Sequence, residues 1–200
     1  MAGPEQEPKL KPPGAGVPWY EFLMLRFYYK PFVAERAPWE QSTEGFAKIT
    51  ARMEKEIEGL TPEQLTKKIL IPPMSGLEDS SRYWSAAMTL EHLVIVGRGM
   101  IGVVRNLSEG RVPPGKASTA TVKPSGKFKP EDAVSAFRQF ANVEFPALLP
   151  SLKNRDSKTT FGHPWLGQTT ARGWYWLLAA HHAVHLKQLR EITKGLKKCA

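Results

Sequence analysis

Apolar residues recur at helical spacing in four separate stretches of the chain, and this periodicity is the strongest structural signal in the sequence. The first stretch follows the i, i+3, i+4, i+7 spacing of an amphipathic helix at Phe46, Ile49, Met53, Ile57 and Leu60. It begins after Pro38, and Gly59 suits its C-terminal end. The segment "TPEQL" that follows has the sequence of a capping box with proline at the first helical position, which predicts a short turn of helix.

Three further long helices are expected. The second runs from about Ser80 to Gly110, with Asp79, Ser80 and Ser81 as candidate caps. The third begins at Pro130 with two acidic residues in its first turn, and the fourth spans roughly Thr170 to Lys194. No strand pattern is evident along the chain. The pattern therefore predicts an all-α fold, an antiparallel four-helix bundle.

The segments outside the bundle have a different composition. Residues 1–17 are rich in proline, glycine and charge, which indicates a flexible tail. Pro18 opens a short extra N-terminal helix that should close before Pro31, and its aromatic side chains should cover the main body; they include Trp19, Phe22 and Phe27. Residues 110–128 predict a long loop. We expect a single helical domain over 18–200, with the bundle core at about 38–195.

Composition limits the class of protein. The 200 residues suffice for one domain with its own core, and 42% hydrophobic with 24% charged residues is typical of a soluble globular chain. One cysteine, Cys199, excludes an internal disulfide framework and a multi-cysteine zinc site. The N-terminus lacks the apolar core of a secretory signal, and no stretch approaches the length of a membrane span. These features predict a cytoplasmic protein without membrane association.

The net charge of +9 raises the question of nucleic-acid binding. The lysines and arginines are scattered, with modest clusters at "KKIL" and "KGLKK", and no nucleic-acid-binding motif accompanies them. We therefore expect a generally basic surface and not a nucleic-acid interface. The charge also favours an anionic small-molecule substrate.

Three of the five histidines crowd into "HHAVH", residues 181–185. At about 100° per residue, His181 and His185 lie one above the other on one helix face, where two imidazoles can bind one metal ion. His182 points about 100° away from His181, although spacing alone does not exclude its pairing with His185. The position after His181 holds histidine, not glutamate, which argues against a zinc peptidase motif.

His92 is the candidate for a third ligand. It lies in "TLEHLVIV" on the second long helix, and the residues on its face are apolar, namely Met88, Ile95, Val96 and Val103. A histidine that faces the interior needs a partner, because an unpaired buried polar group costs about 1–3 kcal/mol. A divalent metal would satisfy all three histidines at once. The alternative is that each is a hydrogen-bonded core histidine.

The segments "YWSAAMTLEHLV" and "GHPWLGQTTARGWYWLLAAHHAVHLKQL" resemble the DinB-like superfamily of metal-binding four-helix bundles, over about residues 38–195. In that family one histidine lies on the second bundle helix, and an H-x-x-x-H pair followed by glutamine lies on the last. The matching residues here are His92, His181, His185 and Gln188. The segment "HPWLG", which begins at His163, is similar to the H-P-F-F-G of one subgroup.

The resemblance implies a three-histidine site with an open coordination position, occupied by zinc or nickel. Characterised relatives include transferases that use a low-molecular-weight thiol as co-substrate. It therefore implies a metal- and thiol-dependent S-transferase that acts on small electrophilic substrates. The alternative is a non-catalytic, metal-stabilised binding or stress-response module of the same fold, acting as a homodimer.

Three further polar residues lie in or beside these motifs. Gln188 is a candidate to hydrogen-bond a ligand imidazole or the open position, and the alternative is an ordinary helix residue. His163 is a candidate for the pocket mouth, and the alternative is a turn residue before proline. Glu91, although adjacent to His92, is expected to face solvent or a neighbouring helix.

Overall fold

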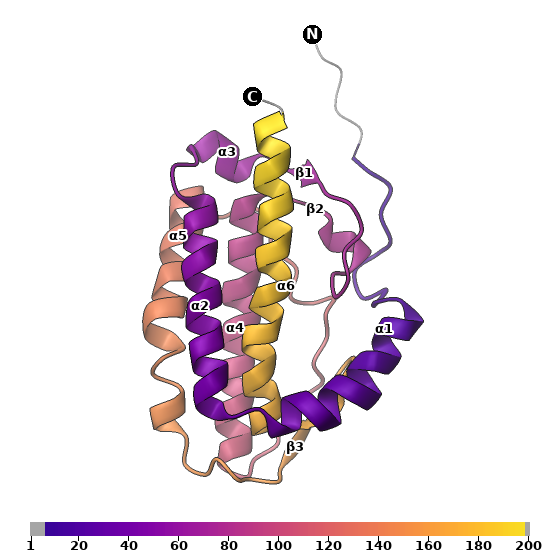
Figure 1. Cartoon of the computed structure of the whole chain (residues 1–200), viewed down its shortest axis with the longest axis vertical. Coiled ribbons are helices and arrows are strands. Elements are labelled where there is room, and N and C mark those ends of the chain that lie inside the picture. Colours follow the sequence, from indigo (N-terminus) through magenta and orange to yellow (C-terminus); the bar gives the residue numbers. More distant parts are fainter. Residues whose placement is uncertain (1–6, 199–200) are drawn as a thin grey trace.

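Four helices lie side by side in the computed structural model, which describes residues 7–198 (Figure 1). They are α2 (Trp39–Ile57), α4 (Ala86–Ser108), α5 (Pro130–Gln139) and α6 (Ala171–Lys198). Helix α6 packs against α2 and α4, and α5 packs against α4. The predicted all-α four-helix bundle is therefore confirmed, and α6 extends four residues further than expected.

Two small antiparallel hairpins accompany the bundle, so the expectation of no strands was wrong. Strand β1 (Ile69–Leu70) pairs with β2 (Tyr83–Trp84). Strand β3 (Thr160–His163) pairs with β4 (Gly167–Thr170), which leads directly into α6. Strands of two to four residues are too short to show an alternating pattern, and pairing with a partner strand holds them in place.

The start of α4 also differs from the expectation. Residues Asp79–Ser81 form a separate 3₁₀ turn, β2 follows, and Ser85 is the N-cap, with its Oγ accepting a hydrogen bond from Met88 N at 3.2 Å. Ser85 and Ser81 have the same capping chemistry. The pairing of β2 with β1 keeps the chain extended through Trp84, and this selects the later serine.

Short elements complete the chain. Helix α3 (Pro62–Thr66) has the predicted capping box, in which Thr61 and Gln64 exchange hydrogen bonds between side chain and backbone. Helix α5 continues into a π-helical turn, Phe140–Glu144, that ends two residues before Pro146, and a 3₁₀ turn follows at Leu149–Ser151. No helix or strand lies between α4 and α5, as predicted for the long loop.

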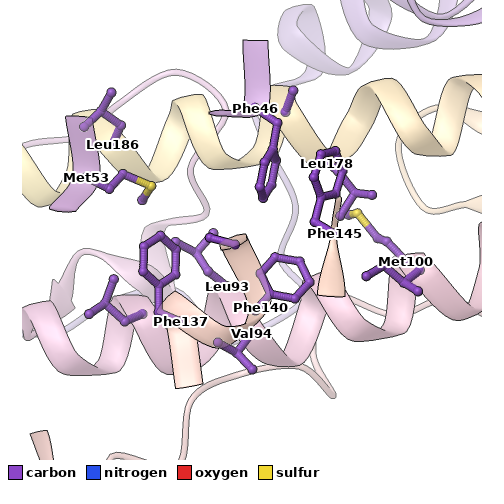
Figure 2. Packing of buried hydrophobic residues seen from close by; sticks show 14 of the residues in the cluster. Phe46, Met53, Leu93, Val94, Met100, Phe137, Phe140, Phe145, Leu178 and Leu186 are labelled. Atoms are coloured by element: carbon purple, nitrogen blue, oxygen red, sulfur yellow. The ribbon is translucent and has the colours of Figure 1, made fainter. Parts of the chain in front are cut away.

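The core is a cluster of aromatic and aliphatic side chains from all four bundle helices (Figure 2). Phe46 of α2 stacks on Phe145 with a centroid distance of 3.7 Å and an interplanar angle of 21°. Phe140 lies directly over Gly97 of α4, where an added Cβ would come within 2.2 Å of the phenyl ring. Gly97 therefore permits the close approach of the Phe140 ring to α4.

The N-terminal helix does not close before Pro31, contrary to the prediction. Helix α1 (Trp19–Met24) continues through a π-helical stretch, Leu25–Val33, into a 3₁₀ turn at Ala34–Arg36. Proline disrupts an α-helix because its ring clashes with the carbonyl of residue i−4. The wider π-helical turn relieves that clash, which explains how the helix passes Pro31.

The aromatic side chains of this N-terminal helix largely face solvent and do not cover the body as expected. Trp19 is 74% exposed and Phe27 is 66% exposed, whereas Phe22 is half-buried. Most of the exposed positions follow helical spacing and form one stripe of large apolar side chains: Trp19, Tyr20, Leu23, Met24, Phe27, Tyr28 and Phe32. In Figure 1 this helix projects from the base of the bundle.

Helix α4 is long and apolar enough to cross a bilayer by length and composition, which differs from the expectation that no stretch approaches such a span. Polar residues such as Glu91 and Arg98 interrupt its apolar positions. Most of its apolar window is buried within the bundle, the position of a core helix.

The segment before α1 was predicted as a flexible tail. Residues 7–17 contain no helix or strand, and two of their backbone N–H groups donate to carboxylates of the body. Lys11 N donates to Asp79 at 2.8 Å, and Gly14 N donates to Glu78 at 3.3 Å. The rest of that predicted tail, residues 1–6, and Cys199 lie outside the described residues.

Candidate metal centre

The bundle brings together the three histidines that the sequence singled out. His92 comes from α4, and His181 and His185 come from successive turns of α6. The Nε2 atom of His181 lies 3.3 Å from that of His92 and 3.2 Å from that of His185. One ligand nitrogen from each ring lies within 4.8 Å of the others, so the three imidazoles converge on one point.

Two of these rings are oriented by hydrogen bonds at Nδ1, the ring nitrogen that does not face the cluster. His92 Nδ1 lies 2.7 Å from the carbonyl oxygen of Val122, and His185 Nδ1 lies 2.6 Å from Oε1 of Gln188. Both partners are acceptors, so both Nδ1 atoms carry the proton and each Nε2 presents a lone pair to the cluster. Gln188 is fixed in turn, because its Nε2 donates to the Ser81 carbonyl at 2.7 Å.

The third ring, His181, has one Nε2 position for a proton and two neighbouring Nε2 atoms that need one. A hydrogen on His181 Nε2 could serve one neighbour well, while a hydrogen on Nδ1 would leave three lone pairs facing one another. The Nδ1 atom of His181 is buried and has no hydrogen-bond partner among the described residues. Lone pairs that converge without a proton between them are the arrangement that a cation satisfies.

The spacing also fits a metal. Zinc–nitrogen bonds of about 2.0–2.1 Å in tetrahedral geometry place ligand atoms about 3.3 Å apart. The two Nε2 separations of 3.2 and 3.3 Å match that value. Three imidazole nitrogens suit several divalent ions, zinc and nickel among them. The residues present therefore fit the ion that the sequence analysis expected.

The protonation state of the cluster suits ligation. Burial lowers the pKa of His92 to about 4, more than the hydrogen bond to Val122 raises it. Burial, reinforced by the neighbouring histidines, lowers the pKa values of His181 and His185 well below 6.5. All three rings are neutral at pH 7, and the neutral imidazole is the form that binds a metal.

His182 lies outside the cluster, in the core. It is fully buried, its Nδ1 donates to the Leu178 carbonyl at 2.7 Å, and its ring lies 4.6 Å from that of Phe46 and 5.8 Å from that of Phe140. Its Nε2 is buried and has no hydrogen-bond partner among the described residues. The 100° turn from His181 thus directs His182 into the core, away from His185.

The three histidines line one side of a cavity of about 330 Å³. His163, at the end of β3, lines the same cavity but is not part of the three-histidine cluster. Its Nδ1 accepts hydrogen bonds from the backbone N–H groups of Trp165 and Leu166, both at 3.2 Å. Burial lowers the pKa of His163 to about 4. The ring therefore shapes the turn between β3 and β4 while it forms part of the cavity wall.

Glu91 is buried and does not face solvent, contrary to the expectation. Its carboxylate accepts three hydrogen bonds from the long loop: from Ser125 N at 2.8 Å, from Ser125 Oγ at 2.6 Å and from Gly126 N at 3.1 Å. Glu91 therefore fixes the loop a few residues after Val122, whose carbonyl orients His92.

A second carboxylate, Glu78, holds the same loop. It accepts hydrogen bonds from Thr119 Oγ1 at 2.8 Å and Lys123 Nζ at 2.9 Å. Burial alone would raise the pKa of Glu78, but the bonds from Lys123 and Thr119 together outweigh it and lower that pKa. The loop is thus fastened on both sides of Val122.

Several groups around the histidines had no sequence signal. Val122 and Ser81 act through backbone carbonyls, which every residue possesses. Glu78 and Glu91 share the function of holding the loop, and this follows only from the hydrogen bonds that Thr119 and Ser125 donate to them in the folded chain. Gln188 was anticipated, and its place three residues after His185 on one helix face is what allows the contact.

Comparison with known proteins agrees with this fold. One solved structure, described as the crystal structure of TT2238, a four-helix bundle protein, superposes with a TM-score of 0.52 at 18% identity, covering 76% of this chain and 98% of that chain. A search of curated proteins gave no match. The model of the DinB superfamily matches residues 46–189, which include all three clustered histidines. The chain belongs to the DinB superfamily.

Proposed function

We propose that the protein binds one divalent metal ion, zinc or nickel, through the Nε2 atoms of His92, His181 and His185. The observation that carries this proposal is that His181 Nε2 lies 3.3 Å from His92 Nε2 and 3.2 Å from His185 Nε2, while the Nδ1 protons of His92 and His185 are bonded elsewhere. Three protein ligands leave a coordination position free, as in catalytic metal sites.

We further propose that the protein is a thiol-dependent S-transferase that acts on a small electrophilic substrate. Support comes from the cavity, since all three histidines line it and a ligand can therefore reach the free position. When bound, a divalent ion favours the thiolate of a low-molecular-weight thiol, whose sulfur bonds to an electrophilic carbon while the leaving group departs with the bonding electrons and the thiol proton passes to water.

The chain's own residues hold the arrangement in place. Val122 and Gln188 fix the orientation and tautomer of His92 and His185, which preserves the direction of their lone pairs. The loop over the histidines, fastened by Glu78 and Glu91, shields this end of the cavity from water.

The competing function is a non-catalytic, metal-stabilised binding or stress-response module. One observation favours it: the ligands come from two different helices, α4 and α6, so an ion between them would link the two and stabilise the fold. Metal binding is common to both functions, and turnover separates them.

The metal site is tested by the metal content of protein purified without an affinity tag. We expect about one ion per chain, and its loss in His92→Ala and His185→Ala. The matched control is His163→Gln, which removes a histidine from the same cavity but not from the cluster, and it should retain the ion. Stoichiometric metal in both alanine variants would rule out the assignment.

The catalytic proposal is tested by turnover of electrophiles with a panel of low-molecular-weight thiols, with and without a chelator. We expect product formation that requires both the thiol and the metal, and that is lost in His185→Ala. Metal-loaded protein without turnover across the panel would instead support the binding module.

A further inference from the structure

The cavity extends well beyond the histidines along α4. His92, Val96, Gly99 and Val103 line it at one-turn spacings, which amounts to about 16 Å of helix. Gly99 gives this wall its depth, because a Cβ added there would meet no atom within 4 Å. The cavity therefore has a long pocket on one side of the three histidines that the metal ligands do not occupy.

Most of the pocket wall beyond the histidines is apolar. The β3–β4 hairpin and the start of α6 contribute Phe161, Trp165 and Trp174, whose rings are a broad aromatic surface. Ile95, Val96 and Val103 contribute aliphatic surface from α4. A pocket with such walls binds a ligand mainly by removing apolar surface from water.

The charged groups that are buried in the wall are already paired. Glu78 is neutralised by Lys123, whose Nζ also donates to Ser81 Oγ at 3.0 Å. His163 is neutral at pH 7, because burial lowers its pKa to about 4. Lys116 is exposed, so its ammonium group is solvated and does not need a ligand partner. A charged ligand body would thus lose its hydration without gaining a buried counter-charge.

We propose that this pocket binds the electrophilic substrate and that the substrate has an uncharged, apolar body, aromatic or branched aliphatic, lying along α4 from Val96 to Val103 with its reactive carbon at the histidine end. This rests on the function proposed above. It replaces the anionic substrate suggested by net charge, because the basic side chains that produce this charge do not offer a free partner inside the pocket.

The test uses Gly99→Leu with Gly102→Leu as its matched control. Both glycines lie on α4 with free space around an added Cβ, but Gly99 lines the pocket and Gly102 does not. The probes are N-phenyl-naphthylamine, which is uncharged, and its sulfonated analogue anilinonaphthalene sulfonate, both of which fluoresce in apolar surroundings. Binding is titrated on the protein as purified, and metal content is measured in parallel.

We expect the uncharged probe to bind, Gly99→Leu to weaken its binding at least tenfold, and Gly102→Leu to leave binding within twofold of the parent. Val103→Phe, at the far end of the pocket, should weaken binding as well. Equal binding by both leucine variants, or tighter binding of the sulfonated probe to the parent, would overturn the proposal. Probe binding and metal content are measured separately. If the protein holds no metal, the probe titrations therefore still test whether the pocket binds an apolar ligand.

Discussion

Gln188 holds His185 from one side and the Ser81 carbonyl from the other, with contacts of 2.6 and 2.7 Å, and all three groups are buried. The amide thus has its orientation fixed by an acceptor at its nitrogen, which leaves its oxygen for the imidazole N–H. A single side chain therefore links the candidate ligand helix α6 to the segment just before β2.

We predict that Gln188→Leu weakens metal binding about 10- to 100-fold, the usual effect of removing the partner that orients a ligand histidine. The His185 ring would lose the acceptor that fixes its tautomer. The measurement is zinc affinity by competition with a chelator, with thermal unfolding of the metal-free protein as the control for folding. An affinity within twofold of the parent would show that Gln188 is an ordinary helix residue.

The contact between Gly97 and Phe140 gives a prediction about stability. Gly97→Ala places a methyl group against the phenyl ring and should lower the free energy of unfolding by about 1–3 kcal/mol. Gly102→Ala, on the same helix with no atom within 4 Å of the added Cβ, should raise it by about 0.5–1 kcal/mol. Urea denaturation of both variants checks this, and a shift of the same sign in both would contradict it.

The buried His182 predicts a dependence of stability on pH. Burial lowers its pKa in the folded protein to about 3, against 6.5 for the free side chain. Above pH 6.5 both states are neutral at this position. As the pH falls below 6.5 the unfolded chain binds a proton and the folded chain does not, so stability is lost progressively until about pH 3.

His182→Leu should therefore reduce the loss of stability between pH 7 and pH 5 by about 2 kcal/mol. Denaturant unfolding of metal-free parent and variant at both pH values measures the difference. The variant also loses the hydrogen bond to Leu178, so the comparison is between the two pH-dependent losses and not between absolute stabilities. Equal losses in parent and variant would exclude His182 as a contributor.

The bundle and its three histidines were predictable because both depend on helical periodicity. The i, i+4 relation placed His181 and His185 on one face, and the apolar neighbours of His92 placed it on the inner side of α4. The same periodicity turned His182 about 100° from His181, although it left a pairing with His185 open. These conclusions depend only on the spacing of residues within one helix, and this spacing can be read from the sequence.

What the sequence missed depends on contacts between distant segments. The β1–β2 pairing moved the start of α4 from the serines near residue 80 to Ser85, although either region caps a helix equally well. Glu91 was expected to face solvent or a neighbouring helix because its partners, Ser125 and Gly126, lie in a loop with no periodic pattern. The carbonyl of Val122 carries no sequence signal at all.

The three hydrogen bonds at Glu91 lead to a last prediction, about the loop over the histidines. Glu91→Ala removes the acceptor for Ser125 and Gly126, and the loop should then detach more often. Trypsin should cleave faster after Lys116 or Lys127, as identified by mass spectrometry. Zinc affinity should fall a few-fold, because Val122 would no longer hold His92.

The control is Glu44→Ala, which removes an exposed carboxylate from α2, far from the loop in sequence. It should leave both cleavage and zinc affinity unchanged. Faster cleavage with unchanged zinc affinity would show that the loop covers the histidines without orienting them. Unchanged cleavage in Glu91→Ala would mean that Glu78, which binds Thr119 and Lys123, is sufficient to hold the loop.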